Sequence, residues 1–389
     1  MSEIVRGLEG VKFAPTRLSK VDGQAGQLTI AGYPLEVLAP NACFEEVLFL
    51  LWNDRLPTMA ELKRLQIEMA SQRYLPPAAV GVLREAAARH LPLMDGLRMG
   101  VDTIGLCTGE PHPAGAVDVG CAVAIVAHMA TLAAAYSRLL KNQTPIDPRP
   151  ELGHAANYLH MLTGQEPHPE AARALETYLN TVVDHGMNAS TFTARVITST
   201  RSDIVSAIVG AIGALKGPLH GGAPGPALDM VFEIRERAAK SGKSVAQEAE
   251  AWAHETVSAG GRIMGFGHRV YKVRDPRADV LGEAARRMFA VTGEAKLYDD
   301  ARVVEDVMLR VLEELKPGRN LRTNVEFYTA LVLHGIGLDA EQFTPTFAVG
   351  RVGGWTAHVL EQVREDRLIR PDAEYTGALG REWVPAAER

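Results

Sequence analysis

The chain has 389 residues, enough for two domains or for one large domain with a smaller one attached. Hydrophobic residues make up 47% and charged residues 23%, the composition of an ordinary soluble globular protein. The formal net charge of −6 argues against a general nucleic-acid binder, so any basic segment must act locally.

Cysteine content and local hydropathy indicate the cellular compartment of the protein. The cysteines are Cys43, Cys107 and Cys121. They are odd in number and form no CxxC, so we expect no disulfide framework, no zinc site and a reducing, cytoplasmic environment. The N-terminus lacks the apolar core of a signal peptide. The most apolar window, 117–132, contains Asp118 and His128 and is short for a membrane span, so it predicts a buried helix.

Helical patterns dominate the chain after an N-terminal arm at 1–34, in which 27–31 alternates like a short strand. Thr58 and Glu61 have the spacing of a capping box at a helix start. Helices are expected at 44–52, 80–89, 117–140, 151–163, 169–183, 204–215, 225–240, 244–260, 301–316 and 355–364. The pattern predicts a mainly α fold with a small N-terminal β element, and no doubly wound sheet.

One of these segments, 204–215, is small and apolar on nearly every face. Such a helix is expected to be buried all round, at the centre of the fold or at a subunit interface. Packing alone explains its sequence.

A glycine-rich segment stands out near the middle of the second half. Gly261, Gly265 and Gly267 fall within seven residues and lead to His268, and four cations follow by Arg277. Glycine allows positive φ and close approach of a ligand, and exposed amides in such a turn can hold an anion. We expect a loop that holds a phosphate-bearing molecule together with a small acid. The plainer interpretation is a surface turn followed by a solvated basic strip.

Three of the twelve histidines, His185, His220 and His268, lie next to glycine. They are too far apart for a helical metal-binding pair, so no metal site is expected. His220 precedes a helix predicted to begin near Pro224 or Pro226, whose electropositive end would keep the imidazole neutral. A neutral imidazole there suits donation to an enolate-like oxygen.

Glu326 is a single acid in an otherwise neutral or apolar run at a predicted helix start. Partial burial would raise its pKa and make it a stronger base toward carbon. The plainer interpretation is a carboxylate that satisfies the helix dipole. Arg277, Arg351 and Arg370 also lie in tight or apolar settings, and three bidentate cations suit a dicarboxylic acid.

Several of these segments together resemble one family. They are DHGMNASTF at 184–192, GPLHGGA at 217–223, GFGHRVY at 265–271 with DPR at 275–277, and NVEFY at 324–328. In this order and spacing they resemble citrate synthases, and residues 22–58 resemble the same family. The resemblance covers roughly residues 8–381.

The resemblance implies a condensation of acetyl-CoA with oxaloacetate to give citrate and CoA. It implies an almost entirely helical fold and a homodimer. The large domain would comprise 1–221 and 336–389, and the small domain 222–335. CoA enters as the thioester substrate, so no cofactor is expected, and neither nucleic acid nor membrane is an expected partner.

By position, His220 resembles the histidine that binds the thioester oxygen, His268 the one that polarises the keto group, and Glu326 the base. The residues that match oxaloacetate ligands are His185, Arg277, Arg351 and Arg370, the last reaching from the partner subunit. The residues expected at CoA are Arg262, Ile263, Met264, Gly265, Phe266, Gly267, Lys272 and Arg319. Closure of one domain over the other would align the substrates and exclude water.

Two residues depart from the family pattern. Glu326 stands where aspartate is usual, and the added methylene shifts the carboxylate by about one bond length, which can cost roughly a hundredfold in rate. Pro224 stands where asparagine is common, at the expected helix start. The chain also looks too short for the extra N-terminal domain of the hexameric, NADH-inhibited enzymes, so a dimer without that control is expected.

Two alternatives remain beside citrate synthase. A 2-methylcitrate synthase would use propionyl-CoA, and a hydrophobic pocket discriminates one methylene by only about 1–3 kcal/mol. A weakly active relative that binds oxaloacetate or CoA as a sensor or assembly partner is favoured only by Glu326.

Overall fold

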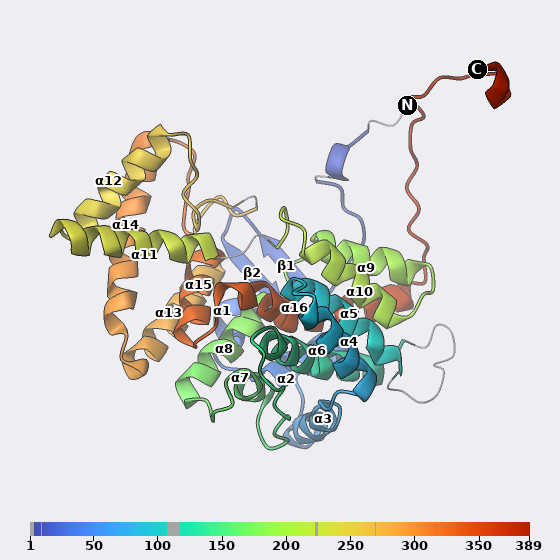
Figure 1. Cartoon of the computed structure of the whole chain (residues 1–389), viewed down its shortest axis with the longest axis horizontal. Coiled ribbons are helices and arrows are strands. Elements are labelled where there is room, and N and C mark those ends of the chain that lie inside the picture. The colour runs from blue at the N-terminus through green and yellow to red at the C-terminus, as the bar shows by residue number, and fades with distance from the viewer. Residues whose placement is uncertain (1–3, 9, 107–116, 222–224, 269) are drawn as a thin grey trace.

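The computed structural model describes residues 4–8, 10–106, 117–221, 225–268 and 270–389. This part of the chain contains sixteen α-helices and one three-stranded sheet, which confirms the predicted mainly α class with a small N-terminal β element (Figure 1). The first helices are α1 Leu35–Leu38, α2 Phe44–Asn53, α3 Met59–Ser71, α4 Pro77–Ala88, α5 Leu93–Asp102, α6 Val119–Leu140, α7 His154–Thr163 and α8 Pro169–Val182. The others are α9 Ala189–Ser199, α10 Ile204–Leu215, α11 Gly225–Ser241, α12 Val245–Ser258, α13 Pro276–Thr292, α14 Ala295–Leu315, α15 Val325–Gly335 and α16 Phe343–Glu365.

The sheet is antiparallel and consists of β1 Ser19–Asp22, β2 Gln27–Ile30 and β3 Tyr33–Pro34. Leu28 and Ile30 alternate with polar residues and point one face of β2 into the core, so the strand predicted at 27–31 is confirmed.

The capping box at α3 is confirmed by its hydrogen bonds. The Glu61 amide donates to the Thr58 hydroxyl over 3.3 Å, and the Thr58 amide donates to the Glu61 carboxylate over 2.9 Å. Three helices begin earlier than their patterns predicted, and one of them, α14, starts at Ala295 instead of 301. Helix α4 starts at Pro77, and α16 starts at Phe343 with Pro345 in its first turn, because a proline there gives up no helical hydrogen bond.

Helix α6 is the buried helix that the apolar window predicted. Within the described residues it is the one helix long and apolar enough to cross a membrane, and 83% of its most apolar window is buried inside the protein. It packs against α16, α5 and α7, so its hydropathy is that of a core helix. Cys43 and Cys121 form no disulfide in the described part of the chain, and Cys107 lies outside it.

Helix α10 differs from its prediction. It packs against α9, α5 and α16 along one face, where Ile204, Ile208 and Ile212 are buried. Its other face is only half-buried, and Gly213 is exposed. Burial on every face is therefore wrong for a single chain, and the open face leaves a subunit interface as the expectation that accounts for its apolar composition.

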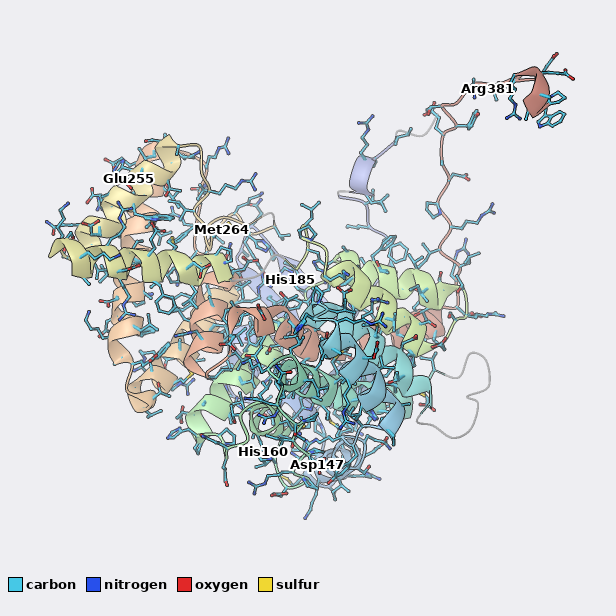
Figure 2. All side chains as sticks on the ribbon, in the orientation of Figure 1. Asp147, His160, His185, Glu255, Met264 and Arg381 are labelled. Carbon is cyan, nitrogen blue, oxygen red and sulfur yellow. The ribbon has the colours of Figure 1, made fainter. Side chains whose placement is uncertain are left out.

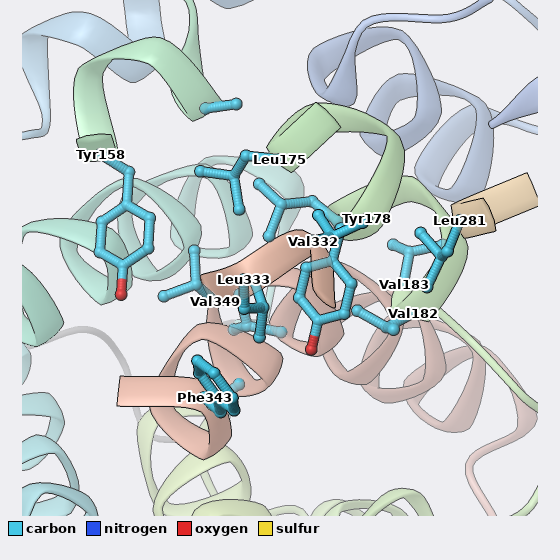
Figure 3. Close-up of a cluster of buried hydrophobic side chains, with 14 of the residues drawn as sticks. Tyr158, Leu175, Tyr178, Val182, Val183, Leu281, Val332, Leu333, Phe343 and Val349 are labelled. Carbon is cyan, nitrogen blue, oxygen red and sulfur yellow. The ribbon is translucent and has the colours of Figure 1, made fainter. Parts of the chain in front are cut away.

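Helices α11, α12 and α14 form a lobe that projects from one side of the molecule (Figure 1). The predicted small domain, 222–335, would comprise this lobe together with α13 and α15. Figure 3 shows where the two predicted domains meet: Tyr178 and Val182 of α8 pack near Leu281 of α13, Leu333 of α15 and Phe343 of α16. The division into domains remains a prediction, and the candidate residues gather along this junction.

Candidate active site

A small pocket lies at the junction between α8, α15 and α16. Its lining is mostly apolar, with a few polar groups. The lining residues are Tyr178, Val182, Leu215, His220, Gly221, Val325, Glu326, Thr329, Phe343, Thr344 and Phe347. The fold thus brings His220 and Glu326, which are distant in sequence, to the same cavity, in the manner of a small-molecule site.

His220 lies in the turn before α11. Pro224 lies outside the described residues, and α11 begins at Gly225, close to the predicted start. Burial, and then the charge of Arg351, lower the pKa of His220 to about 4. The imidazole is therefore neutral near pH 7, as expected. The causes that the structure supplies are burial and a buried cation, and the contribution of the helix end stays a prediction.

Ser190 at the start of α9 holds the His220 ring, a contact that sequence reasoning missed. Its Oγ lies 2.7 Å from His220 Nε2 and 2.8 Å from Asn188 Oδ1, and Trp355 Nε1 donates to it over 3.1 Å. Asn188 Oδ1 already accepts the Thr191 amide as the helix cap. When the hydroxyl hydrogen goes to His220, the ring carries its own hydrogen on Nδ1, available to a substrate oxygen. Only the cap spacing from Asn188 to Thr191 signalled this cluster in the sequence.

Glu326 is the second residue of α15 and is half-buried. Its amide donates to Asn324 Oδ1 over 3.0 Å, so Asn324 caps the helix. The Glu326 carboxylate itself has no hydrogen-bond or ion-pair partner among the described residues. Glu326 lies in the first turn of α15, so the plainer interpretation, a carboxylate that satisfies the helix dipole, stays beside the role of a base. Burial raises its pKa, and the charge of Arg277 opposes this, as a base in an apolar setting requires.

His268 ends the glycine-rich loop with its ring fixed. Nδ1 accepts the amides of Val270 over 3.0 Å and Tyr271 over 3.1 Å, so the neutral ring carries its hydrogen on Nε2. Burial, and then Arg277, lower the pKa of His268 to about 4. Arg277 Nη2 lies 3.3 Å from Nε2. Both are donors, so an oxygen placed between them would accept from both.

His185 joins the same group. Its Nε2 lies 3.0 Å from the Tyr271 hydroxyl, and its ring meets the His268 ring edge-on at 5.9 Å. Burial, followed by the charges of Arg277 and Arg351, lowers the pKa of His185 well below its usual value. The three predicted histidines therefore all lie in the site region as neutral rings at pH 7.

Arg277 and Arg351 differ in how their positive charges are compensated. Arg277 is buried and binds both oxygens of Asp275, with distances of 3.0 and 2.8 Å, and Asp275 also accepts the Val325 amide at the start of α15. Arg351 is also buried, but it donates Nε to the Val182 carbonyl and packs over the Phe347 ring. No acidic side chain among the described residues pairs with it, and burial lowers its pKa to about 10. The buried carboxylate of Asp184 opposes this lowering without forming an ion pair, so the guanidinium can still bind a substrate anion.

Arg370 is not brought to this pocket. It is exposed on the C-terminal tail after α16 and lies with Leu8 and Phe13 of the N-terminal arm along a separate groove. Figure 1 shows this tail leaving the body of the chain. Its expected role in a partner's site remains a prediction.

The predicted CoA segment forms an ordered loop. Gly265 and Gly267 have φ of +85° and +84°, and Phe266 pairs with Thr323 in a β-bridge. A Cβ on Gly267 would lie 2.9 Å from Leu321, so packing within the chain, as well as φ, demands glycine there. From the sequence alone, these glycines are explained by positive φ and the close approach of a ligand.

The side chains of that segment divide into two groups. Those of Arg262, Met264, Lys272 and Arg319 are exposed, and those of Ile263 and Phe266 are buried. In the view of Figure 2, Met264 and His185 both appear where the projecting lobe meets the body. The exposed group is the part that can contact a ligand without rearrangement. In the described part of the chain, no three His, Cys, Asp or Glu residues are grouped to hold a metal ion.

Comparison with known proteins gives a consistent family. The family model for the citrate synthase C-terminal domain matches residues 7–372. Citrate synthase 2 of Bacillus subtilis is 40% identical over 99% of each chain, and a 2-methylcitrate synthase of Mycobacterium tuberculosis is 36% identical over 96% of this chain and 91% of its own. The citrate synthase of Thermoplasma acidophilum, solved as a ternary complex with carboxymethyl coenzyme A and oxaloacetate, matches the whole of both chains with a TM-score of 0.86 and 32% identity. The chain belongs to the citrate synthase family.

Proposed function

We propose that the protein condenses acetyl-CoA with oxaloacetate and water to give citrate and CoA, as an acyltransferase. The observation that carries this is the shared pocket of His220 and Glu326, one a neutral donor and the other a half-buried carboxylate without a partner among the described residues. The buried, unpaired guanidinium of Arg351 supplies the complementary site for an acid. Membership of the family and the likeness to the ternary complex support the same reaction.

The first step is enolisation of the thioester. The α-protons of acetyl-CoA are weakly acidic, so Glu326 removes one while the N–H of His220 binds the developing enolate oxygen. A preorganised donor of this kind contributes about 3–4 kcal/mol to transition-state stability. The raised pKa of Glu326 strengthens it as a base, and the lowered pKa of His220 keeps the ring neutral.

The second step forms the carbon–carbon bond. Arg351 and Arg277 bind oxaloacetate carboxylates, with His185 beside them. His268 Nε2–H and Arg277 Nη2 polarise the keto oxygen, which the enolate carbon attacks. Water then cleaves the thioester of the product and releases CoA and citrate. The exposed side chains of the 262–272 loop and Arg319 hold the CoA portion.

The proposal also covers the oligomeric state and the cellular compartment. The open face of α10 is the proposed contact of a homodimer, in which Arg370 reaches the partner's site. The 222–335 domain closes over the substrates. We expect the reaction to proceed in the cytoplasm with no cofactor.

A second candidate, 2-methylcitrate synthase, is favoured by the 36% identical relative that carries that name. Its propionyl-CoA substrate adds one methylene beside the reacting carbon. The apolar wall of Val182, Leu215 and Phe343 borders the space in which that methylene would lie. Such a wall discriminates by only about 1–3 kcal/mol.

Thiol release with oxaloacetate and either acyl-CoA tests both candidates. The expected result is turnover with acetyl-CoA that exceeds turnover with propionyl-CoA. A preference for propionyl-CoA of about tenfold or more would replace the main proposal with the second. Ligand binding without turnover of either thioester would overturn both and leave a binding protein.

Variants at position 326 test the base. Glu326→Gln should lose most activity, because an amide cannot accept the proton, whereas Glu326→Asp keeps the base and should remain active. The matched control is Glu250→Gln, which removes an exposed carboxylate paired with Arg310. Full activity in Glu326→Gln would rule out Glu326 as the base.

A further inference from the structure

Tyr178 of α8 lines the pocket of His220 and Glu326, yet no role follows for it from the reaction as described. Its side chain is fully buried, and its hydroxyl has no hydrogen-bond partner among the described residues. Figure 3 shows it surrounded by aliphatic side chains of α8, α15 and α16.

Other buried tyrosines of this protein have partners for their hydroxyls. Tyr136 donates to the Leu91 carbonyl over 2.7 Å, Tyr158 lies 3.0 Å from the Thr346 hydroxyl, and Tyr328 donates to Glu305 over 2.5 Å. A buried hydroxyl without a partner is unfavourable, because it has lost water and gained nothing in return. Phenylalanine would fill the same space without that cost.

The pocket holds one group that matches this donor. Glu326 is the only carboxylate among the lining residues, and it too has no partner in the described part of the chain. His220, the other titratable lining group, is already held by Ser190. An unused donor and an unused anionic acceptor therefore line one cavity.

We propose that Tyr178 is a positioning residue for Glu326, donating its hydroxyl to the carboxylate in the substrate-bound enzyme. This rests on the proposed function. One carboxylate oxygen is held by the hydroxyl, and the other faces the α-carbon of the thioester. In the structure the two groups are not bonded, so the Glu326 side chain rotates to make the contact. Compared with aspartate, glutamate has an extra methylene, which lets the carboxylate reach the Tyr178 hydroxyl. The same methylene adds a rotatable bond, and the hydrogen bond to Tyr178 restricts that rotation.

The titratable and charged groups near Glu326 come from several elements. Tyr178 lies on α8, His220 in the turn before α11, Arg277 on α13 and Arg351 on α16. Arg277 is bound by Asp275, and Arg351 is assigned to the acid substrate. Among the lining hydroxyls, that of Tyr178 is the fully buried one without a partner in the described part of the chain, so it is the donor assigned to the ionised base. A hydrogen bond to the ionised form lowers a carboxyl pKa, so its loss raises the pKa of Glu326.

The test is Tyr178→Phe, with kcat measured against pH for acetyl-CoA and oxaloacetate. Expected are a fall in kcat of about tenfold and a shift of the acid limb to higher pH by about one unit, with both KM values within about twofold. The melting temperature should not fall, because no bond is lost in the free protein. Tyr158→Phe is the matched control, since it removes a bonded, buried hydroxyl outside the pocket. It should lower the melting temperature and leave the acid limb in place.

The outcomes separate the two proposals. If the unaltered enzyme turns over and Tyr178→Phe keeps its kcat and acid limb, the positioning role is overturned and the function stands. A rise in the KM for oxaloacetate alone would assign the hydroxyl to the substrate and overturn the contact with Glu326. If the unaltered enzyme does not turn over, the proposed function fails and this role fails with it.

Discussion

The hydroxyl of Ser190 lies 2.7 Å from Nε2 of His220, and this contact determines which ring nitrogen is left for substrate. The Ser190 hydroxyl lies within donating distance of both Asn188 Oδ1 and His220 Nε2, and the proposed reaction requires its hydrogen to go to His220. The remaining ring hydrogen then lies on Nδ1. A residue that touches no substrate thus governs the donor that meets the enolate.

Ser190→Ala should lower kcat by about tenfold or more, because the donor is no longer held in one tautomer and orientation. Trp355 and Asn188 lose a partner as well, so the free energy of unfolding should fall by about 1–3 kcal/mol. The measurements are steady-state kinetics and urea unfolding. Ser137→Ala is the control, because Ser137 accepts a hydrogen bond from Gln342 elsewhere in the core. An equal loss of kcat in both variants would contradict the role of Ser190.

Arg351→Gln should raise the KM for oxaloacetate by about a hundredfold, because a charge-assisted pair with a carboxylate is lost. Its free energy of unfolding should not fall as it does when a buried ion pair is broken, since Arg351 has no acidic partner in the described part of the chain. Arg195→Gln provides the contrast. It leaves Glu361 and Glu365 without their buried cation and should cost about 3–5 kcal/mol. Comparable losses of stability in the two variants would show that Arg351 is a structural cation.

Acidification should destabilise the protein between about pH 6.5 and pH 4. Burial lowers the pKa of His154 to about 3 and those of His220 and His268 to about 4, whereas an unfolded histidine titrates near 6.5. In this window the unfolded chain binds more protons, so stability is complete above pH 6.5 and is lost as the pH falls. The slope is at most about 1.4 kcal/mol per pH unit for His154, and less for the two partly exposed rings, whose charge is screened.

Urea unfolding at several pH values measures this slope. His154→Gln should flatten it, because the fully buried ring has neither nitrogen hydrogen-bonded. An unchanged slope in that variant would mean that other groups control the acid transition.

Gly23→Ala should disturb the site from outside the pocket. The Gly23 carbonyl accepts the Lys272 amide over 2.9 Å, and a Cβ at Gly23 would lie 2.2 Å from the Val270 carbonyl oxygen. The backbone must then shift in the segment whose Val270 and Tyr271 amides hold His268. Both stability, by about 1–3 kcal/mol, and kcat/KM should fall.

The control is Gly81→Ala in α4, where a Cβ would meet no atom within 4 Å. This change should raise stability by about 0.5–1 kcal/mol and leave kinetics unchanged. Normal kinetics in Gly23→Ala would show that the hairpin turn does not support His268.

Much of the fold was predictable because its signals are local. The capping box of Thr58 and Glu61 needs only residues three apart, and the strand at 27–30 needs only alternation. The apolar run that became α6 was correctly predicted as a buried helix, since its charged and polar residues are few. Motifs in a fixed order indicated the family and the candidate residues.

The arrangement of the site needed the tertiary structure, because burial and long-range contacts are not written in neighbouring residues. Burial and the charge of Arg351 lower the pKa of His220, and neither cause can be read from the neighbouring sequence. Asp275 neutralises Arg277, while Arg351 remains unpaired. The hydroxyl of Tyr178 gave no sign in the sequence, where it is one more apolar-face position of a helix.

The sequence by itself therefore determined the mainly α class, most helices and the residue types available for chemistry, since these depend on periodicity and on contacts within a turn. Only the tertiary structure decided which of those groups share a pocket and which charges lack partners. It also left Arg370 exposed on a tail and one face of α10 open. These outcomes depend on how α8, α13, α15 and α16 pack. Packing depends on contacts between residues that are far apart in the sequence.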